Sequence, residues 1–255
     1  MTNAPGAPSA PADVLAIPVG PLPVPPRAKT VLVFGGTFDP PHRGHIELPS
    51  LVRRKVGADW LLFVPAALSP LKKDNPLASD ADRVEMLRLA LLDRGETSAA
   101  VATLELDRAK ESDAVDELHP RKPSYTLDTL RFMRRELGER VTLRLLIGAD
   151  QAASFHKWRE PREIIRIAEP LVMLRTPMET VDRLMTELAP HWTAEELDRW
   201  RSRVVEVPVI DAEATKIRAA LLSEGPDSPM LDDVLPPAVL REIRTRGIYA
   251  RPRGS

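Results

Sequence analysis

From residue 29 onward, short apolar runs alternate along the chain with longer segments in which apolar residues recur every three or four positions. The short runs are rich in β-branched residues and have the length of a strand, whereas the longer segments have the period of an amphipathic helix. Strands separated by helices predict an α/β fold with a parallel sheet. We expect strands over residues 31–34, 60–65, 101–106, 142–147, 171–174 and 204–207.

The helical spacing recurs in several segments, and each would place an apolar stripe on the sheet. We expect helices over residues 81–92, 126–137, 178–188, 194–205 and 237–246, the last one ending at Gly247. A further helix should follow His45, and Pro49 inside it removes one backbone hydrogen bond and should kink or delay its first turn. The predicted fold is a Rossmann-like, doubly wound parallel sheet with helices on both faces, in a single domain.

The first 28 residues have a different composition, since they consist largely of Ala and Pro with scattered Gly. Such a segment can bury little surface and cannot keep a helical ladder, so we expect residues 1–28 to be a disordered extension. A signal peptide is disfavoured, because no basic region precedes the first apolar residues and prolines interrupt them. The expected organisation is an extension over 1–28, one domain over 29–250 and a tail over 251–255.

Composition limits the classes of partner. The 255 residues include 36 basic and 37 acidic ones, for a net charge of -1, so no overall field would attract nucleic acid or an anionic membrane. The longest apolar runs are strand-sized and fall short of the roughly 20 residues that a membrane span needs. Cysteine is absent, which excludes disulfides and thiolate chemistry and suits a reducing compartment. We expect a soluble, cytoplasmic protein with neither nucleic acid nor membrane as partner.

The segment after the first expected strand has the features of a phosphate site. Gly35-Gly36-Thr37 follows the strand, and two prolines and His42-Arg43-Gly44-His45 then lead into a helix. Glycines let a ligand approach the backbone, and a helix N-terminus offers unpaired N–H groups to an anion. The two histidines are three residues apart, so both imidazoles could reach the same phosphate. The segment matches neither a Walker A loop nor Gly-x-Gly-x-x-Gly.

Two plainer interpretations of this segment stay open. One is a Gly-Pro turn with two surface histidines. The other is a zinc site that uses His42 and His45, but such a site needs further ligands, and no cysteine or acidic cluster lies nearby in the sequence. We therefore expect no metal ligand from the protein.

The residues from Gly35 to His45 resemble the Gly-Gly-Thr-Phe-Asp-Pro and His-x-Gly-His signature of the nucleotidylyltransferase superfamily, and the chain is similar to bacterial nicotinate-nucleotide adenylyltransferases over nearly all of residues 29–250. The resemblance implies transfer of AMP from ATP to nicotinate mononucleotide, which forms deamido-NAD and pyrophosphate, with Mg²⁺ carried by ATP. Nicotinamide mononucleotide and 4′-phosphopantetheine stay open as acceptors, and so does a homo-oligomeric state.

The resemblance also implies roles for particular residues. The implied catalytic residues are His42, His45, Lys72 and Arg218. The implied ATP-binding residues are Gly35, Gly36, Thr37, Phe38, His42, Gly44, His45, Gly148, Asp150, Thr215 and Arg218. The implied acceptor-binding residues are Thr37, Tyr125, Thr126, Asp150, Trp158 and Arg175. The plainer alternatives are a solvated lysine for Lys72, helix caps for Thr126 and Asp150, and core packing for Trp158.

The chain departs from the family pattern at four positions. The family's Ile-Ser-Ser-Thr-x-Ile-Arg reads Ala-Glu-Ala-Thr-Lys-Ile-Arg over residues 212–218, and Leu71 replaces a histidine. Glu213 would repel a triphosphate unless its carboxylate points away. A weakly active or inactive nucleotide-binding regulatory paralogue is therefore the alternative from another class. Two smaller expectations are that Arg83 serves mainly in packing, and that residues 109–121 form a mobile charged loop.

Overall fold

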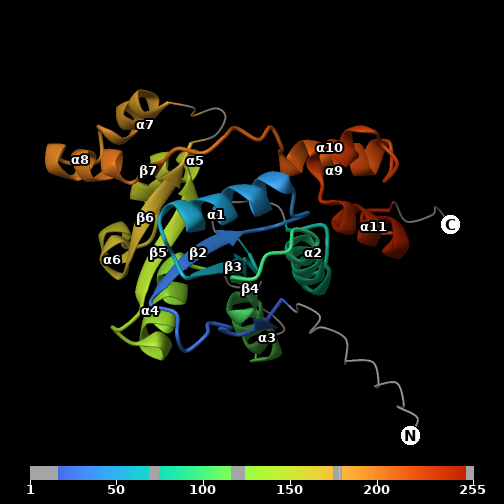
Figure 1. The fold of residues 1–255 in the computed structure, drawn as a ribbon, viewed down its shortest axis with the longest axis horizontal. Helices are drawn as coiled ribbons and strands as arrows, with labels where there is room; N and C mark the ends of the chain where they lie inside the picture. The colour runs from blue at the N-terminus through green and yellow to red at the C-terminus, as the bar shows by residue number, and fades with distance from the viewer. Residues whose placement is uncertain (1–16, 69–74, 116–123, 175–177, 179, 251–255) are drawn as a thin grey trace, which may run out of the picture.

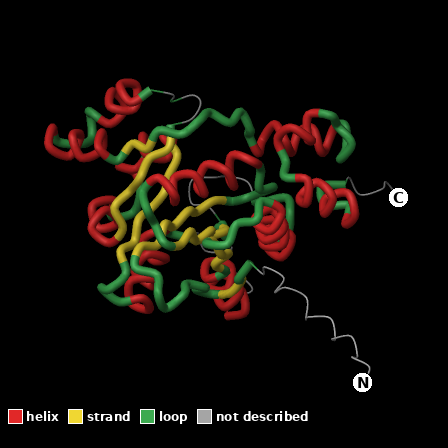
Figure 2. Tube along the Cα trace, in the orientation of Figure 1, coloured by secondary structure: helices red, strands yellow, loops and turns green. Residues whose placement is uncertain are grey.

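The computed structural model describes residues 17–68, 75–115, 124–174, 178 and 180–250. Their strands form one parallel sheet in the order β1-β4-β3-β2-β5-β6-β7 (Figures 1 and 2). The strands are β1 (Val19–Gly20), β2 (Thr30–Gly36), β3 (Trp60–Pro65), β4 (Ala99–Ala102), β5 (Thr142–Gly148), β6 (Ala168–Met173) and β7 (Val204–Val205). From β4 to β7 this is the strand order of a dinucleotide-binding sheet, with its switch point between β2 and β5. The predicted Rossmann-like fold is confirmed.

The helices lie on both faces of the sheet, and Figure 1 shows α7 and α8 at one end of the molecule and α9, α10 and α11 at the other. The longer helices are α1 (Arg43–Lys55), α2 (Asp80–Asp93), α3 (Leu104–Val115), α4 (Thr126–Leu137), α7 (Val181–Leu188), α8 (Ala194–Ser202), α9 (Ala214–Ser223) and α11 (Pro237–Arg246). The short ones are α5 (Ala149–Ala153), the 3₁₀ helix η1 (Phe155–Lys157), α6 (Pro161–Ile167) and α10 (Met230–Val234). No helix within the described ranges is long and apolar enough to cross a bilayer.

The core is divided by the sheet into two apolar layers. Successive side chains of a strand point to opposite faces, so Val31 and Val33 of β2 pack with α4 and α6, whereas Leu32 and Phe34 pack with α1, α2 and α11. Both faces of β2 are therefore buried, which is why the strand is a continuous apolar run rather than an alternating one.

The expected disordered extension over 1–28 is wrong for its second part. Strand β1 pairs with β4, and the N–H of Val101 donates to the carbonyl of Pro18 at 3.0 Å. The indole N–H of Trp60 donates to the carbonyl of Pro23 at 2.9 Å. A proline-rich segment can do this at the edge of a sheet, because there its missing N–H groups face no partner strand. The ordered domain thus includes residues 17–28, and residues 1–16 lie outside the described part.

Several element boundaries also differ from the prediction. The strand expected over 101–106 ends at Ala102, and α3 occupies 104–115, so the expected loop over 109–121 begins as a helix. Leu106 and Ala109 of α3 are three positions apart, as on one face of a helix, and both pack against Ala67. The helix expected over 194–205 ends at Ser202, and the strand after it covers only 204–205. Helix α1 begins at Arg43, before His45, and continues through Pro49, so the proline does not delay its start.

Candidate active site

The segment that joins β2 to α1 folds around Gly36 and Phe38. A Cβ atom on Gly36 would lie 2.8 Å from Cζ of Phe38, so this position has room only for glycine. Phe38 has a φ of 52°, in the left-handed region that larger residues rarely adopt, and the residue is 1% exposed. The Phe38 side chain therefore belongs to the core, and any contact of this residue with ATP falls to its backbone.

The two histidines lie side by side at the start of α1. His42 is the N-cap residue, and its ring stacks on that of His45 with centroids 3.6 Å apart and an interplanar angle of 24°. A Cβ atom on Gly44 would lie 3.3 Å from the His42 ring, so a larger residue between the two histidines would crowd this ring. The ring edge of Phe38 contacts His45 from the core side, with centroids 5.2 Å apart. The structure thus brings the histidines together on the first helical turn, as their spacing predicts.

Asp39 connects the same segment to distant parts of the chain. Its buried carboxylate accepts hydrogen bonds from the N–H groups of Leu77 (2.8 Å) and Ala78 (3.0 Å) and from the hydroxyl of Tyr249 (2.6 Å). Burial and the neighbouring Asp39 charge raise the pKa of the Tyr249 phenol, which keeps the hydroxyl protonated as a donor. The residue before the two prolines is therefore held by contacts that no local sequence pattern reveals.

Two arginines hold the carbonyl groups of this segment. Arg83 is fully buried, and it donates to the carbonyl of Thr37 at 2.6 Å while pairing with Asp80 at 2.6 Å. Arg83 was expected mainly to pack, but its guanidinium also fixes the phosphate-binding segment. Arg218 of α9 donates to the carbonyl of Asp39 at 2.8 Å. The structure thus brings α9, with Thr215 one turn before Arg218, next to the histidine segment.

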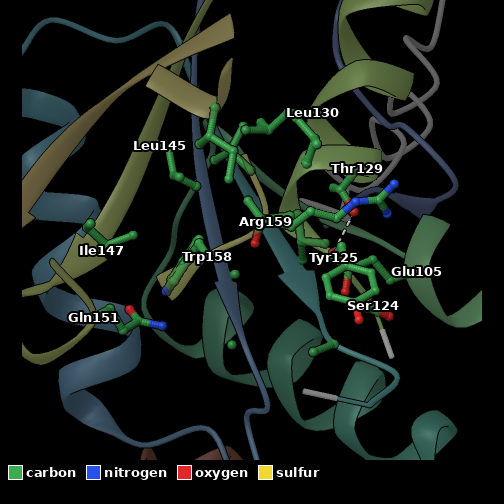
Figure 3. A pocket seen from close by; sticks show the side chains of 18 of the residues that line it. Glu105, Ser124, Tyr125, Thr129, Leu130, Leu145, Ile147, Gln151, Trp158 and Arg159 are labelled. Carbon is green, nitrogen blue, oxygen red and sulfur yellow. Dashed lines mark hydrogen bonds between the residues drawn. The ribbon is translucent and has the colours of Figure 1, made fainter. Parts of the chain in front are cut away.

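A cavity of about 370 Å³ opens beside the ends of β2 and β5 (Figure 3). Its wall combines Gly35, Gly36 and Thr37 with two other groups of residues that the sequence singled out. One group is Ser124, Tyr125 and Thr126 at the start of α4, and the other is Lys157 and Trp158 at the end of η1. In Figure 3 the ring of Trp158 lies between Gln151 and Ile147 on one side and Arg159 and Tyr125 on the other. Residues that are 87 to 123 positions apart in the chain thus line one cavity, at the switch point of the sheet.

Arg159 is a cation of this cavity that the sequence did not single out. Its guanidinium lies 5.3 Å from the centre of the Tyr125 ring and pairs with Asp128 at 3.2 Å. Together with Lys157 it gives the wall next to Trp158 a positive character. Tyr125 is the N-cap residue of α4 but its side chain makes no capping hydrogen bond, so the helix N-terminus opens toward the cavity. Both features favour an anionic group on the bound molecule.

Glu105 is the second residue of this cavity that the sequence did not single out. Its carboxylate accepts a hydrogen bond of 2.6 Å from the Thr129 hydroxyl, to which Arg108 also donates at 3.1 Å. Burial raises the pKa of the Glu105 carboxyl, against the lowering effect of the Thr129 hydrogen bond and the Arg108 charge. The sequence did not indicate Glu105 because a strand was expected over 101–106. In the structure Glu105 lies in the first turn of α3 and faces the cavity.

Other residues chosen from the sequence lie at the edge of this site or outside the described ranges. Lys72 and Arg175 lie outside the described ranges. Gly148 is the N-cap residue of α5, and its N–H donates to Oε1 of Gln151 at 3.1 Å. Asp150 is exposed in the first turn of α5, and the cavity is lined by Gln151 in its place.

Glu213, the main departure from the family pattern, has a local partner. Its Oε1 accepts a hydrogen bond from Nζ of Lys216 at 2.8 Å, and this contact raises the pKa of the Lys216 ammonium. Glu213 is the N-cap residue of α9, yet its side chain makes no capping hydrogen bond. The carboxylate is therefore paired with a cation of its own helix and leaves the amides of that helix N-terminus open.

Comparison with known proteins agrees with this geometry. The sequence model of the cytidylyltransferase-like family matches residues 33–220. A protein of Chromobacterium violaceum named "Probable nicotinate-nucleotide adenylyltransferase" is 32% identical over 224 residues, which cover 85% of this chain and 97% of that one. A protein of the same name from Neisseria meningitidis is 30% identical over 223 residues, 88% of this chain and all of that one.

Solved structures give the same fold. The nicotinic acid mononucleotide adenylyltransferase of Plasmodium falciparum, complexed with NaAD, superposes with a TM-score of 0.61 at 14% identity, covering 87% of this chain and 97% of that one. The same enzyme complexed with APC superposes with a TM-score of 0.60. On the family match and the full-length relatives together, the chain belongs to the cytidylyltransferase-like family and, within it, to the nicotinate-nucleotide adenylyltransferases.

Proposed function

We propose that this chain transfers the adenylyl group of ATP to nicotinate mononucleotide and releases deamido-NAD and pyrophosphate. The observation that carries the proposal is that Gly35, Gly36 and Thr37, at the end of β2, line the same cavity as Trp158 and the start of α4. Its volume of about 370 Å³ is in the range of small-molecule sites. The relatives that match the chain over most of its length carry the name of this activity.

The reaction needs positioning and charge stabilisation more than a protein base. An oxygen of the mononucleotide's 5′-phosphate attacks the α-phosphorus of ATP, and the bond to the β-phosphate breaks with its electron pair leaving on pyrophosphate. The attacking phosphate is already an anion at neutral pH, so no proton has to be removed. His42 and His45 donate hydrogen bonds to the phosphoryl oxygens, on which charge increases during transfer. Thr215 and Arg218 bring the start of α9 to the triphosphate.

The acceptor is held on the other side of the cavity. Trp158 stacks on the pyridine ring, and the open N-terminus of α4 at Tyr125 and Thr126 receives the carboxylate of nicotinate. Lys157 and Arg159 add positive charge to the same wall. An amide carries no charge for these groups to stabilise, so the arrangement favours nicotinate over nicotinamide mononucleotide. Lys72 and Arg175 complete the proposal as ligands of the pyrophosphate and of the acceptor phosphate.

A divalent metal accompanies ATP in nucleotidyltransferases of this kind, and we assign Mg²⁺. Within the described residues no group of three His, Cys, Asp or Glu side chains is placed to hold a metal ion. In this proposal the ion enters with ATP as part of the substrate, and the chain supplies cations and N–H donors around the triphosphate. The lack of cysteine is consistent with the cytoplasm as the compartment.

The alternative of an inactive paralogue rests on Glu213, and the Lys216 contact removes much of its basis. The test measures pyrophosphate release with Mg-ATP and three acceptors: nicotinate mononucleotide, nicotinamide mononucleotide and 4′-phosphopantetheine. We expect kcat/KM to be at least about 10-fold higher for the acid than for the amide, which corresponds to about 1.4 kcal/mol. Absence of turnover with the acid, together with ordinary ATP binding by calorimetry, would establish the paralogue instead.

A further inference from the structure

A second cavity, of about 340 Å³, lies between α6 and α8. It is on the other side of α6 from the substrate cavity, since Ile164 lines the first cavity and its neighbours on α6 line the second. Its wall consists mainly of four arginines and two tryptophans, Arg162, Arg166, Arg199, Arg203, Trp192 and Trp200, and Ile165 and Glu196 complete it. No step of the proposed adenylyl transfer uses these residues.

Three of the arginines form the exposed rim of this second cavity. Each is paired with one carboxylate: Arg162 with Glu196, Arg166 with Glu163 and Arg199 with Glu195. The rim side chains are between 61% and 73% exposed. The Arg199–Glu195 pair is exposed on both sides and contributes little to stability, so this guanidinium can turn toward a bound anion at small cost. Arg162 and Arg166 each donate two hydrogen bonds to their carboxylate, and they would meet an anion with their remaining N–H groups.

Arg203 forms the base of the second cavity and is compensated less completely. It is 8% exposed, and its Nε lies 3.3 Å from Oε1 of Glu169, a carboxylate that Arg144 also contacts. One carboxylate thus serves two guanidinium groups. Burial lowers the pKa of Arg203, and the positive charges of Arg199 and Arg144 lower it further. A buried cation is stable only when it is well paired, so this position gains from an additional anion.

We propose that the cavity between α6 and α8 binds a phosphate group, with Arg203 at its base and Arg162, Arg166 and Arg199 around its rim. Guanidinium groups suit this ligand, because their fork of N–H donors matches two phosphate oxygens. Inorganic phosphate and the phosphate of a nucleotide share this chemistry.

The aromatic side chains connect this second cavity to the first. Arg162 lies 5.3 Å from the centre of the Trp192 ring, and Arg203 lies 5.5 Å from that of Trp200. Phe155 packs against Trp200 with ring centroids 5.3 Å apart, and against Trp158 of the substrate cavity at 4.8 Å. An anion that fixes the two arginines therefore also restrains the cluster behind Trp158. This consequence rests on the proposed function, whereas the binding itself does not.

The test is a ³¹P NMR titration of the full chain in EDTA, where no turnover occurs, with phosphate, pyrophosphate and AMP as probes. The variants are Arg203→Gln and Arg199→Gln, the second because its exposed side chain can be replaced without affecting the core. The control is Arg201→Gln, on the same helix, which is 54% exposed, pairs with Asp182 and does not line the cavity. We expect saturable binding whose Kd rises at least about 10-fold in both variants and stays unchanged in the control.

Equal affinities in all three variants, or no saturable binding, would overturn the proposal. AMP also binds in the substrate cavity, so the probes are compared by the affinity that Arg199→Gln loses and Arg201→Gln keeps. A larger loss for AMP than for inorganic phosphate would identify a nucleotide as the source of the phosphate group, and an equal loss would identify the free ion. The connection to Trp158 has its own readout, the KM for the mononucleotide with and without phosphate. We expect phosphate to change this KM in the wild type and in Arg201→Gln but not in Arg199→Gln, and an unchanged wild-type value would refute the connection. Loss of turnover would leave the titration intact, so the two proposals fail separately.

Discussion

The two sides of the substrate cavity are built in different ways. On the histidine side, backbone carbonyls and a buried carboxylate are held by Arg83, Arg218 and Tyr249, and these contacts come from three separate parts of the chain. On the acceptor side, Tyr125 and Arg159 are only half-buried, and the side chains of the Arg159–Asp128 pair are 48% and 41% exposed. The histidine side is thus fixed before any ligand binds, whereas the acceptor side can adjust to its ligand.

The difference suggests that the histidine side serves the chemical step and the acceptor side serves the selection of the acceptor. Groups that stabilise a transition state must stand in place beforehand, since their reorganisation would add to the barrier. Groups that select an acceptor can be exposed and mobile, because they act through binding. Substitutions on the histidine side should therefore lower kcat, and those on the acceptor side should raise KM.

The largest effect is expected for His45→Ala. Loss of one preorganised donor should lower kcat roughly 10²- to 10³-fold. The ring of His45 is only partly buried, so the melting temperature should change little. The measurement is steady-state pyrophosphate release, with His191→Ala as a control, because His191 is an exposed histidine that stacks on His156 away from the cavity. A loss below about 10-fold would remove His45 from the mechanism.

A smaller effect, and the most direct test of the difference between the two sides, comes from two matched Tyr→Phe variants. Tyr249→Phe removes a buried hydrogen bond to Asp39 and should lower the free energy of unfolding by about 1–3 kcal/mol. The resulting shift of the histidine segment should lower kcat roughly 10-fold with KM almost unchanged. Tyr125→Phe should leave both stability and kcat close to wild type and alter only the KM for the acceptor. Steady-state kinetics give kcat and KM for each variant, and urea unfolding gives its free energy of unfolding. If both variants changed these values in the same way, the proposed difference between the histidine side and the acceptor side would be wrong.

Trp158→Ala should act on binding alone. Loss of the stacking surface should raise the KM for the mononucleotide about 10-fold, or about 1.4 kcal/mol, while kcat at saturation changes less than about threefold. Trp158→Phe keeps an aromatic face and should recover most of the affinity. A control is Trp60→Phe, since Trp60 contacts Pro23 and lies away from this cavity. A fall in kcat with an unchanged KM would assign Trp158 to the chemistry.

The smallest effect is expected for Glu105→Gln, and it depends on pH. Burial raises the pKa of Glu105 above its usual value of 4.5, so folding favours the protonated form. The stability that this group contributes is therefore greatest below that value and is lost as the pH rises through the folded-state pKa. Gln keeps an acceptor for Thr129 but does not titrate. The melting temperature of the variant should rise relative to wild type between pH 4.5 and 7, by a few degrees at most. If the difference in melting temperature between the variant and the wild type stayed constant over this range, the raised pKa of Glu105 would be refuted.

Local patterns predicted the elements that carry their own signal. Helices α4 and α11 have the predicted bounds, because each has an apolar stripe and a clear end. The proximity of His42 and His45 could also be predicted from the sequence, since it depends on a single helical turn. Residues whose place depends on distant contacts were not. Asp39 and Tyr249 are 210 positions apart, and Glu105 faces the cavity only because α3 replaces the end of an expected strand.

The segment that contains β1, near the N-terminus, is a second case in which distant contacts determine a structure that the local sequence does not predict. Five prolines interrupt any helical or strand period in residues 17–28, so their sequence resembles that of a disordered tail. Their order comes from β4, whose backbone N–H groups find acceptors in this segment, and from Trp60. A partner strand that is distant in sequence leaves no mark on the local composition of either one.

Strand β1 also determines how the chain behaves toward other copies of itself. Without it, β4 would be an outer strand with unpaired N–H and C=O groups, a surface onto which a strand of another molecule can add. Because β1 is only two residues long and lies between Pro18 and Pro21, it covers β4 but offers almost no ladder of its own. We therefore expect the proline-rich segment to protect the chain against aggregation. A variant that begins at residue 29 should precipitate at concentrations that the full chain tolerates.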